Sequence, residues 1–426
     1  QMPGVNVLIK GTTTGTTSDS DGNYKLSIPD EGGTIVFSFI GYANQEQEIG
    51  ARTVIDVSLA PDATQLSEVV VTALGLQSEK RSLGTSVAVV KAEDIENTRQ
   101  TNFLNAFTGK VAGVRVQSSN GMVGSSTSMF IRGFTSFNSS NQPLFVVDGI
   151  PIDNSGGTNS LQTGVSNSNR GIDINPDDIE SQTILKGPAA AVLYGSRAAA
   201  GAVIITTKKG SMSKNKKNII EYTSNYNVTQ VNRLPSLQNT YAQGDNGIYN
   251  PLSLNSWGPK ITGQDSVTNY LGKRELLKAY PNNVKDIFRQ GSNVQNSINF
   301  KGGNEKSNYI FSYSNLREDG ILKNNTLTRN TFKVAANTNL TEKLSAGASF
   351  TYFNTISQRT PIGNQQANPL FRGYFLPRSY NLANYPYQNP NGTQTYFDPS
   401  TDNPLWTIQN NTYNDRVDRM LANFNV

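Results

Sequence analysis

The stretch LSAGASFTY at residues 344–352 decides the fold of this chain, because apolar and small polar residues alternate along it. Successive side chains of a β-strand point to opposite faces, so a period of two gives a strand one apolar and one polar side. The apolar side carries Leu344, Ala346, Ala348, Phe350 and Tyr352. The pattern predicts a β-strand whose two faces meet different surroundings.

The same alternation recurs in five further segments between residues 218 and 426. Their apolar positions are Ile220, Tyr222, Tyr226 and Val228; Ile298 and Phe300; Tyr309, Phe311 and Tyr313; Phe332, Val334 and Ala336; and Met420, Ala422, Phe424 and Val426. Connections of roughly 60, 3, 10, 4 and 60 residues separate the segments, so long and short connections alternate as membrane β-barrels require. GGNEKS (302–307) and NLTEK (339–343) are the expected periplasmic turns.

The composition of the 426 residues favours turn-rich β structure in about two or three domains. Hydrophobic residues make up 36% and charged residues 16%. These fractions are too low in charge for a disordered chain and too low in aliphatic residues for a large α/β enzyme. No apolar run reaches the roughly 18 residues of a membrane helix, whereas the short alternating strands of a membrane barrel need no such run.

The chain contains neither cysteine nor histidine, which excludes disulfides, zinc–thiolate sites and histidine acid–base catalysis within this sequence. Asp177 and Asp178 follow Pro176 and are interpreted as a helix start rather than a glycosidase pair. DSDGN at 19–23 has the wrong glycine spacing for an EF-hand and predicts a hairpin turn. We expect no enzyme activity, no catalytic residues, no bound metal and no cofactor.

The net charge of +5 has one dense source, KKGSMSKNKK at 208–217. Nucleic-acid binding would favour basic residues interleaved with aromatic ones, and this cluster contains no aromatic residue. We interpret it as a solvated linker and expect no nucleic-acid partner.

Turn spacing divides the chain into four parts. We expect a small β-sandwich over 1–60, an extended linker over 61–78, a compact α+β domain over 79–210 and the first strands of a membrane barrel over 211–426. In the third part, Glu93 and Asp94 suit the start of a helix, and another helix is expected over Ala189–Tyr194. Six strands are fewer than the about eight that close a membrane barrel, so a larger barrel is expected. The first residues look like the middle of a β domain, so an N-terminal segment is expected to be missing.

Several stretches in this order resemble one protein family. QMPGVNVLIKGTTTGTTSDSDGNYKL and FSFIGYANQEQEI resemble the carboxypeptidase-regulatory-like domain that precedes many Bacteroidetes transporters. SEVVVTALG at 67–75 resembles a TonB box, and FIRGF, VVDGIPI and ILKGPAAAVLYGSRAAAGAVIITTKKG resemble a plug domain. Together they are similar to a SusC-like TonB-dependent outer-membrane receptor.

The resemblance implies a mainly β protein with an antiparallel barrel of about 22 strands filled by the plug. It places the barrel in the cell outer membrane, in contact with the lipid bilayer, and the N-terminal domain and TonB box in the periplasm. The implied partners are the inner-membrane energy transducer TonB, a SusD-like surface lipoprotein, and a glycan or peptide substrate. A dimer of the SusC–SusD pair is the implied assembly.

The resemblance gives a role to the TonB box, whose residues are Ser67, Glu68, Val69, Val70, Val71 and Thr72. The outer membrane has neither ATP nor an ion gradient, so energy must come from a partner that spans the periplasm. Three valines favour an extended backbone, which can add as a strand to the edge of a partner's sheet. The alternative is an ordinary strand of the preceding domain.

Two sets of residues are candidates for holding the plug and for contacting the substrate. Arg132 and Asp148 lie at strand ends and are expected to form ion pairs that anchor the plug inside the barrel. The substrate contacts are expected on outward loops, where aromatic rings among polar side chains suit sugars and peptides equally. These candidates are Phe134, Phe137, Asn138, Tyr241, Trp257, Tyr380, Tyr387 and Trp406.

These features predict TonB-dependent active import of an oligosaccharide or peptide across the outer membrane, together with a SusD-like lipoprotein. The alternative is a SusC-like subunit reused as a structural or assembly component of a larger outer-membrane secretion or barrel-assembly complex.

Overall fold

The structure is a computed structural model of the chain. It describes residues 2–12, 14–28, 33–39, 42–50, 52–60, 69–71, 77–79, 87–96, 98, 100–118, 121–137, 140–154, 168–187, 189–210, 218–363 and 366–426.

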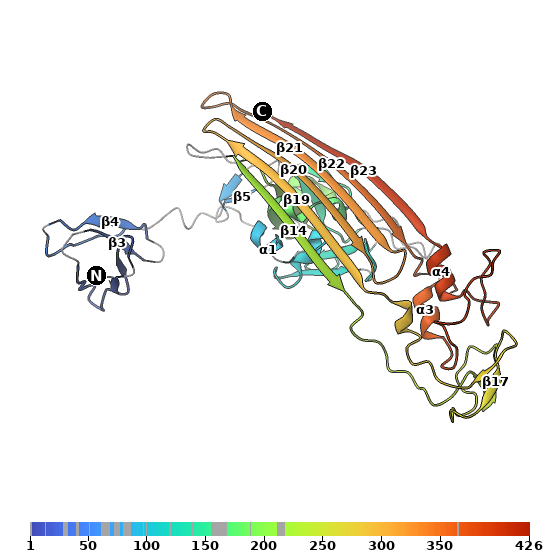
Figure 1. Cartoon of the computed structure of the whole chain (residues 1–426). Coiled ribbons are helices and arrows are strands. Elements are labelled where there is room, and N and C mark those ends of the chain that lie inside the picture. Colours follow the sequence, from blue (N-terminus) through green and yellow to red (C-terminus); the bar gives the residue numbers. More distant parts are fainter. Residues whose placement is uncertain are drawn as a thin grey trace. The chain divides into compact units, whose positions relative to one another are not determined.

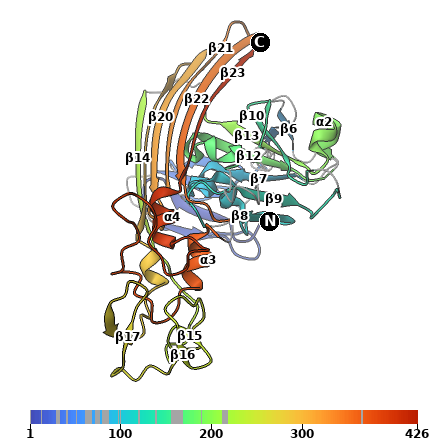
Figure 2. The ribbon, with the colours of Figure 1, turned by 90° about the vertical axis from the view of Figure 1, so that its right-hand side faces the viewer.

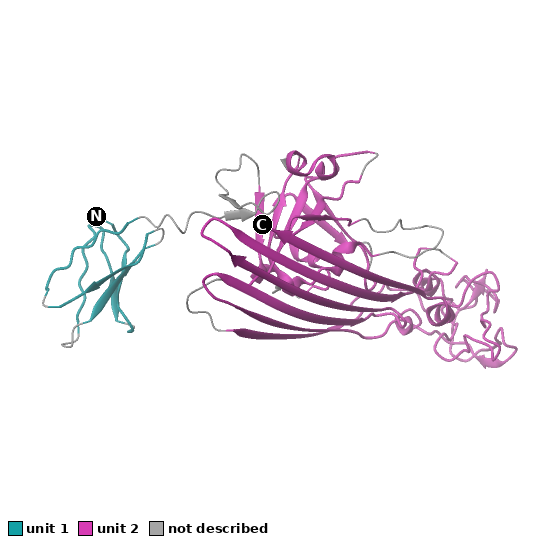
Figure 3. Ribbon diagram, turned by 90° about the horizontal axis from the view of Figure 1, so that it is seen from above, with its two compact units in different colours: residues 1–72, 76–84 teal, residues 73–75, 85–426 magenta. Residues whose placement is uncertain are grey.

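The chain divides into two compact units (Figure 3). The first comprises Gln1–Thr72 and Leu76–Gly84, and the second comprises Ala73–Gly75 and Thr85–Val426. No helix within the described ranges is both long and apolar enough to cross a bilayer.

The first unit is built on an antiparallel sheet of four strands in the order β2-β1-β3-β4. These strands are β1 (Asn6–Ile9), β2 (Gly15–Thr17), β3 (Thr34–Ser38) and β4 (Gln45–Glu48). The expected second layer of a sandwich is occupied by residues 23–28 and 52–60, which form no strand. Their apolar side chains pack on the sheet, and the Tyr24 hydroxyl donates to the Ile55 carbonyl at 2.8 Å.

The DSDGN segment of the first unit forms the predicted turn. Asp19 accepts hydrogen bonds at Oδ1 from the backbone N–H groups of Asp21 (3.0 Å) and Asn23 (2.8 Å). Among the described residues, no cluster of three or more acidic side chains is arranged to hold a metal ion.

The second unit begins with an α+β domain, as expected, which we call the plug domain. Its strands are β7 (Val87–Lys91), β8 (Val114–Ser118), β9 (Thr127–Ile131), β10 (Leu144–Val147), β11 (Ile150–Ile152), β12 (Ile179–Leu185) and β13 (Ala202–Thr207). Its helices are α1 (Ala92–Glu96), α2 (Ala189–Tyr194) and the 3₁₀ helices η4 (Phe103–Phe107), η5 (Arg170–Asp173), η6 (Pro176–Asp178) and η7 (Ser196–Ala198). The main sheet has the order β11-β10-β13-β12-β7, and β8 pairs with β9. The helices expected near Glu93 and Asp94 and over Ala189–Tyr194 are present as α1 and α2.

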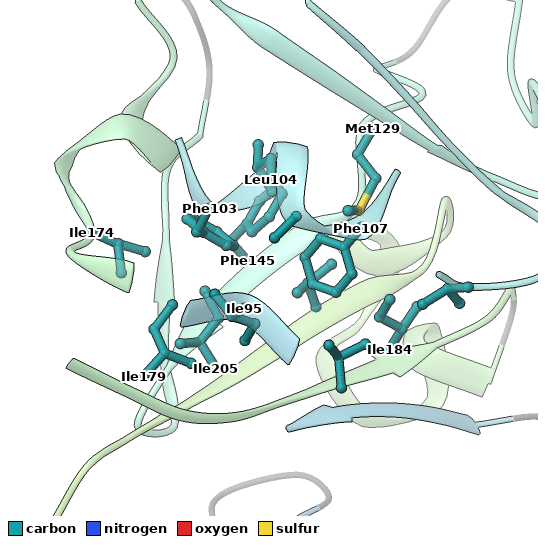
Figure 4. Packing of buried hydrophobic residues seen from close by; sticks show 14 of the residues in the cluster. Ile95, Phe103, Leu104, Phe107, Met129, Phe145, Ile174, Ile179, Ile184 and Ile205 are labelled. Atoms are coloured by element: carbon teal, nitrogen blue, oxygen red, sulfur yellow. The ribbon is translucent and has the colours of Figure 1, made fainter. Parts of the chain in front are cut away.

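The plug domain has a hydrophobic core of its own (Figure 4). Phe103 of η4 lies edge-on to Phe107 and to Phe145 of β10, with ring centroids 6.4 and 6.1 Å apart. Ile184 and Ile205 of the main sheet are fully buried in the same cluster. The buried residues of this core all belong to the plug domain, and Leu421 of the later strand segment 413–425 packs against them.

Six long antiparallel strands follow, in sequential order, as the alternation predicts (Figure 1). They are β14 (Ile219–Thr229), β19 (Gly291–Gly303), β20 (Ser307–Asp319), β21 (Thr326–Asn339), β22 (Ser345–Arg359) and β23 (Tyr413–Asn425). Tight turns close β19–β20 at 304–306 and β21–β22 at 340–344, where GGNEKS and NLTEK predict them. We call these six strands the barrel sheet.

The two long connections, 230–290 and 360–412, gather beyond one end of the barrel sheet (Figure 2). They contain β15 (Gly244–Asp245), β16 (Ile248–Tyr249), β17 (Ser266–Thr268), β18 (Arg274–Leu276), the 3₁₀ helix η8 (Lys285–Ile287), α3 (Pro369–Tyr374) and α4 (Pro404–Asn410). A shared core holds them together, and we call them the loop cluster. Met122 of the plug domain and Leu322 of the β20–β21 connection also enter this core, whose other buried residues are Ile287, Leu376, Tyr380, Leu382, Phe397 and Ile408.

Candidate functional site

The two faces of the barrel sheet differ in chemistry. On the outward face, Tyr222 and Tyr226 of β14 each expose 66% of their surface, and Phe424 of β23 exposes 80%. On the inward face, Ser312 and Lys333 are each 1% exposed. This is the alternation of membrane barrel strands, with apolar side chains outside and polar side chains inside. The inward face meets the plug domain, and this contact is the candidate functional site.

The first polar contact is made by the turn of η6, which begins after Asn175. Asp177 accepts hydrogen bonds at Oδ2 from Gln295 Nε2 and Ser297 Oγ of β19, both at 2.7 Å. Asp178 accepts at Oδ1 from Ser312 Oγ of β20 at 2.6 Å. Both carboxylates are buried, and buried carboxylates require such partners. The interpretation of these residues as a helix start is correct, and the structure adds their attachment to two barrel strands.

Asp173, at the end of η5, makes the second contact. Its Oδ1 accepts from Thr355 Oγ1 of β22 at 3.0 Å. Its Oδ2 lies 3.6 Å from Arg170 Nη1 and 3.9 Å from Arg419 Nη1 of β23. Burial raises the pKa of Asp173 above its ordinary value, and the two arginines oppose that shift. The carboxylate is therefore held in a site that favours its neutral form despite the two nearby cations.

Arg329 of β21 makes the third contact, in which a barrel side chain binds backbone groups of the plug domain. It is fully buried, and its Nη1 donates to the carbonyl oxygens of Thr101 (3.2 Å), Ile172 and Ile174 (3.3 Å). Thr101 belongs to one plug segment, and Ile172 and Ile174 belong to another. One guanidinium therefore attaches both segments to the barrel sheet. A buried guanidinium with several acceptors is a strong, directional contact.

The remaining contacts extend this interface. Lys333, also on β21, donates from Nζ to the carbonyl of Lys208 at 2.8 Å. A small apolar cluster joins the two sides and comprises Val123, Ile172, Leu316 and Leu327. Within the described residues, the plug domain is thus attached by several hydrogen bonds, by the ion pair of Asp173 with Arg419, and by apolar contacts that include this cluster and Leu421 of β23.

Asp148, a predicted plug anchor, forms a tight hairpin turn with Gly149 between β10 and β11. Both residues have positive φ, 47° and 88°, which a two-residue turn of this kind requires and which Asp-Gly favours. The Asp148 carboxylate accepts from the backbone N–H of Thr207 at 2.9 Å and from its hydroxyl. The Asp148 carbonyl accepts from Asn423 Nδ2 of β23 at 2.6 Å. Asp148 therefore contacts the barrel sheet, through its backbone rather than through an ion pair.

Arg132, the other predicted anchor, follows β9 with φ 59° and precedes Gly133 with φ 91°. Its backbone N–H donates to the Gly113 carbonyl at 2.7 Å. Within the described ranges the structure shows no ion pair between Arg132 and Asp148, because Thr207 binds the Asp148 carboxylate. A role for Arg132 in anchoring stays a prediction.

The valines of the predicted TonB box form β5 (Val69–Val71), which pairs with β6 (Gln77–Glu79). The sequence suggests no partner strand for these valines, whereas the structure pairs Val70 with Ser78. Ser67, Glu68 and Thr72 lie outside the described residues. The backbone of the three valines is extended, as strand addition to a partner would need.

The predicted substrate contacts fall into two groups. Phe134 and Phe137 expose 74% and 104% of their surface, and Trp257 exposes 63% with its ring 6.0 Å from that of Tyr241. These four aromatic side chains are open to a ligand in this structure. Asn138 lies outside the described residues.

The other group belongs to the loop cluster. Tyr380 is 1% exposed and packs against Phe397 and Tyr385, with ring centroids 4.9 and 5.0 Å away. It is a core residue, which corrects the expectation that it presents a surface to the substrate. Trp406 of α4 is half-buried and donates from Nε1 to the Gly392 carbonyl at 3.0 Å. Tyr387 is also half-buried.

Sequence reasoning missed Arg329 and Lys333. Both are cations on the polar face of an alternating strand. That position was the sequence feature that could have identified them. A cation facing a barrel interior must find acceptors there, and only the fold shows that plug carbonyls supply them.

The chain is similar in sequence to two known domain families and to known receptors. Residues 79–202 match the TonB-dependent receptor plug domain, and residues 1–71 match the CarboxypepD_reg-like domain. A TonB-dependent receptor of Formosa agariphila is 30% identical over 99% of this chain and 38% of its own length. The TonB-dependent receptor SusC of Bacteroides thetaiotaomicron is 34% identical over 78% of this chain and 30% of its own length. The chain thus spans less than two fifths of the length of these relatives.

A solved structure shares the fold. It is the RagAB peptide importer in its open-open state, with a TM-score of 0.56 and 24% identity over 77% of this chain and 36% of that chain.

Proposed function

We propose that this chain, which belongs to the SusC-like TonB-dependent receptors, serves the active import of an oligosaccharide or peptide across the outer membrane. The barrel spans the membrane, and the N-terminal domain and the TonB box lie in the periplasm. TonB supplies the energy, and a SusD-like lipoprotein covers the outer side.

The polar attachment of the plug domain is the observation that carries the proposal. Importing a large polar solute requires that the plug domain move or remodel while the barrel stays intact. The carboxylates of Asp173, Asp177 and Asp178 are held by hydroxyl and amide groups of β19, β20 and β22. Hydrogen bonds to a charged group contribute about 1.5–3 kcal/mol each in net terms, because water takes the place of the lost partner when they break. Most of the apolar core of the plug domain comes from the plug domain itself, and Leu421 of β23 is the barrel residue that packs against it.

The extended backbone of Val69–Val71 supports the coupling to TonB. A strand can join the edge of a partner's sheet through main-chain hydrogen bonds, and side chains then set the specificity. A pulling force on this strand would act on the chain that leads into β7, the edge strand of the main plug sheet. Force would thus reach the plug domain through the backbone.

The loop cluster supports the outer partner and the cargo. It is a folded body with its own aromatic core, and it exposes Tyr241 and Trp257. A stable surface with exposed aromatic side chains suits both a lipoprotein lid and a polar solute. The two cargo classes that we propose are oligosaccharides and peptides. A dimer of the receptor–lipoprotein pair is part of the same proposal.

Deleting residues 67–74 in the full-length receptor tests this function. We expect uptake to be lost while insertion into the outer membrane and purification of the lipoprotein partner remain normal. Normal uptake by the deletion variant would contradict the proposal. Co-purification of secretion or barrel-assembly subunits, without a transport defect in the deletion variant, would instead indicate a structural component of a larger complex.

A further inference from the structure

A polar cavity lies between the plug domain and the C-terminal end of β20. Its volume is about 190 Å³. The residues that carry its chemistry are Thr101, Asn102, Asn105, Gly121, Met122 and Glu318. Met122 also belongs to the loop-cluster core, so the cavity lies where the plug domain meets the outward side of the protein.

Asn102 and Asn105 offer the N–H groups of their side-chain amides to the cavity, because their amide oxygens are already hydrogen-bonded. Asn102 Oδ1 accepts from the backbone N–H of Leu104 at 3.1 Å, which fixes the orientation of the amide. Its Nδ2 is buried and has no hydrogen-bond partner among the described residues. Asn105 Oδ1 accepts from the hydroxyls of Ser118 and Thr127, both at 3.3 Å. The acceptor oxygens of both amides are thus already engaged, and their N–H groups are the donors offered to a ligand.

Glu318 supplies the opposite function. Its Oε2 accepts from Thr101 Oγ1 at 3.0 Å, which fixes the carboxylate at the cavity wall. A carboxylate has about four lone-pair sites, so acceptor capacity remains for a ligand. The cavity therefore combines amide donors with the carboxyl oxygens of Glu318 as acceptors.

This combination selects the chemistry of the ligand. An ammonium group can donate to Glu318 but cannot accept from the amides, and a carboxylate or phosphate can accept from the amides but has no hydrogen to donate to Glu318. A hydroxyl group does both, and neighbouring hydroxyls on one sugar ring can meet the amides and the carboxylate together. A peptide bond also donates and accepts, but peptide side chains need apolar surface, and Met122 and Ile172 are the main apolar lining.

We propose that this cavity binds one neutral monosaccharide unit of the cargo through its hydroxyl groups. The inference rests on the proposed import function and narrows its cargo to a saccharide. The ligand would lie against Thr101, whose carbonyl accepts from Arg329, so that the bound sugar touches the attachment of the plug domain to β21.

Gly121 offers a way to block the cavity. A Cβ built at this position meets no atom within 4 Å, and its φ does not lie in the left-handed region. Gly121→Phe should fill the cavity without backbone strain, and Gly121→Ala is the matched control that leaves it open. Asn105→Asp is a second variant of nearly identical shape, which replaces the amino donor with an acceptor.

The experiment uses the purified full-length receptor in detergent and saturation-transfer NMR with glucose, galactose, mannose, xylose and fructose at millimolar concentration. We expect at least one sugar to bind the wild type and Gly121→Ala, and to bind Gly121→Phe and Asn105→Asp at least tenfold more weakly. Circular dichroism of each variant shows whether it is folded, and Asn105→Asp decides the matter if Gly121→Phe is not.

The proposal is overturned if no sugar gives a signal that the two variants weaken. Binding to the purified receptor needs no TonB, so this result is independent of the uptake test. Peptide uptake that requires residues 67–74, together with no sugar binding, would overturn the cavity proposal and leave the import function standing.

Discussion

Arg329 is the largest fully buried side chain among the described residues. Its guanidinium binds plug carbonyls, and the carboxylates of Asp173, Asp177 and Asp178 act on it electrostatically. Arg329→Met should destabilise the plug attachment by at least about 1–3 kcal/mol, because it leaves buried plug carbonyls without their donor. Limited proteolysis of the full-length receptor should then cleave plug segments at lower protease concentration.

Arg317→Met is the control for this prediction. Arg317 lies on neighbouring β20, but its side chain is 71% exposed, and its pair with Asp319 spans 3.6 Å. Exposed ion pairs contribute about 0–1 kcal/mol, so the plug domain should stay protected. Equal protease sensitivity in the two variants would show that the buried guanidinium has no special role.

Asp173 makes stability depend on pH. Its folded-state pKa is raised, chiefly by burial, so the folded state binds the proton more tightly than the unfolded state. The contribution of this group to stability is therefore greatest below its ordinary pKa and falls as pH rises through the raised, folded-state pKa. The Asn side chain of Asp173→Asn cannot titrate. As pH rises from the ordinary pKa of Asp through the raised pKa of Asp173, the free energy of unfolding of the wild type should therefore fall relative to that of the variant. Urea unfolding at a series of pH values measures the difference, and a difference that stays constant with pH would contradict the prediction.

At the scale of single elements, the strand β5 gives the sharpest prediction. Val70→Pro removes a backbone N–H from the box, and main-chain bonds are what strand addition depends on. We expect uptake to fall at least tenfold while the receptor still inserts into the membrane. Transport assays with labelled cargo in cells that carry the variant measure this.

Ser78→Pro is the matched control, because Ser78 pairs with Val70 but lies on β6. It disturbs the β5–β6 pairing and leaves the backbone of the box intact. Uptake should therefore persist. Loss of uptake in Ser78→Pro alone would mean that TonB recognises the paired strands rather than the box.

The elements differ in how far their sequences predict them. The barrel strands are predictable because one face meets polar surroundings and the other does not, so that alternation is imposed along the whole strand. The loop cluster is not, because its core joins segments as distant as Ile287 and Phe397, which no local pattern relates. Tyr380 was predicted to contact the substrate and is buried instead, because the local sequence does not distinguish exposed from buried tyrosines in a Tyr- and Asn-rich stretch.

The candidate site was predictable only in outline. The Asp148–Gly149 pair predicts a turn on its own, because few other pairs tolerate positive φ at both positions. Which atom of Asp148 reaches β23 depends on the placement of the plug domain against the barrel sheet. The contacts of Asp177 likewise span about a hundred residues of sequence, from η6 to β19.

At the scale of the whole molecule, the question is whether the plug domain leaves the barrel sheet during transport. The chain contains no cysteine, so two introduced thiols would be the only ones in this sequence. Asp178→Cys with Ser312→Cys replaces a plug-to-β20 contact of 2.6 Å, and a short cross-linker that reductant cleaves can join them. We expect cross-linking to stop uptake and reductant to restore it.

Ser181→Cys with Thr206→Cys is the control, because these paired residues of β12 and β13 both lie within the plug domain. Cross-linking them leaves the plug domain free of the barrel sheet, so uptake should continue if the plug domain moves as a body. Uptake that is blocked by both cross-links would show that the plug domain must unfold internally. Uptake that survives the first cross-link would show that β20 stays attached throughout, and that the path for the cargo opens on the side of the plug domain away from η6.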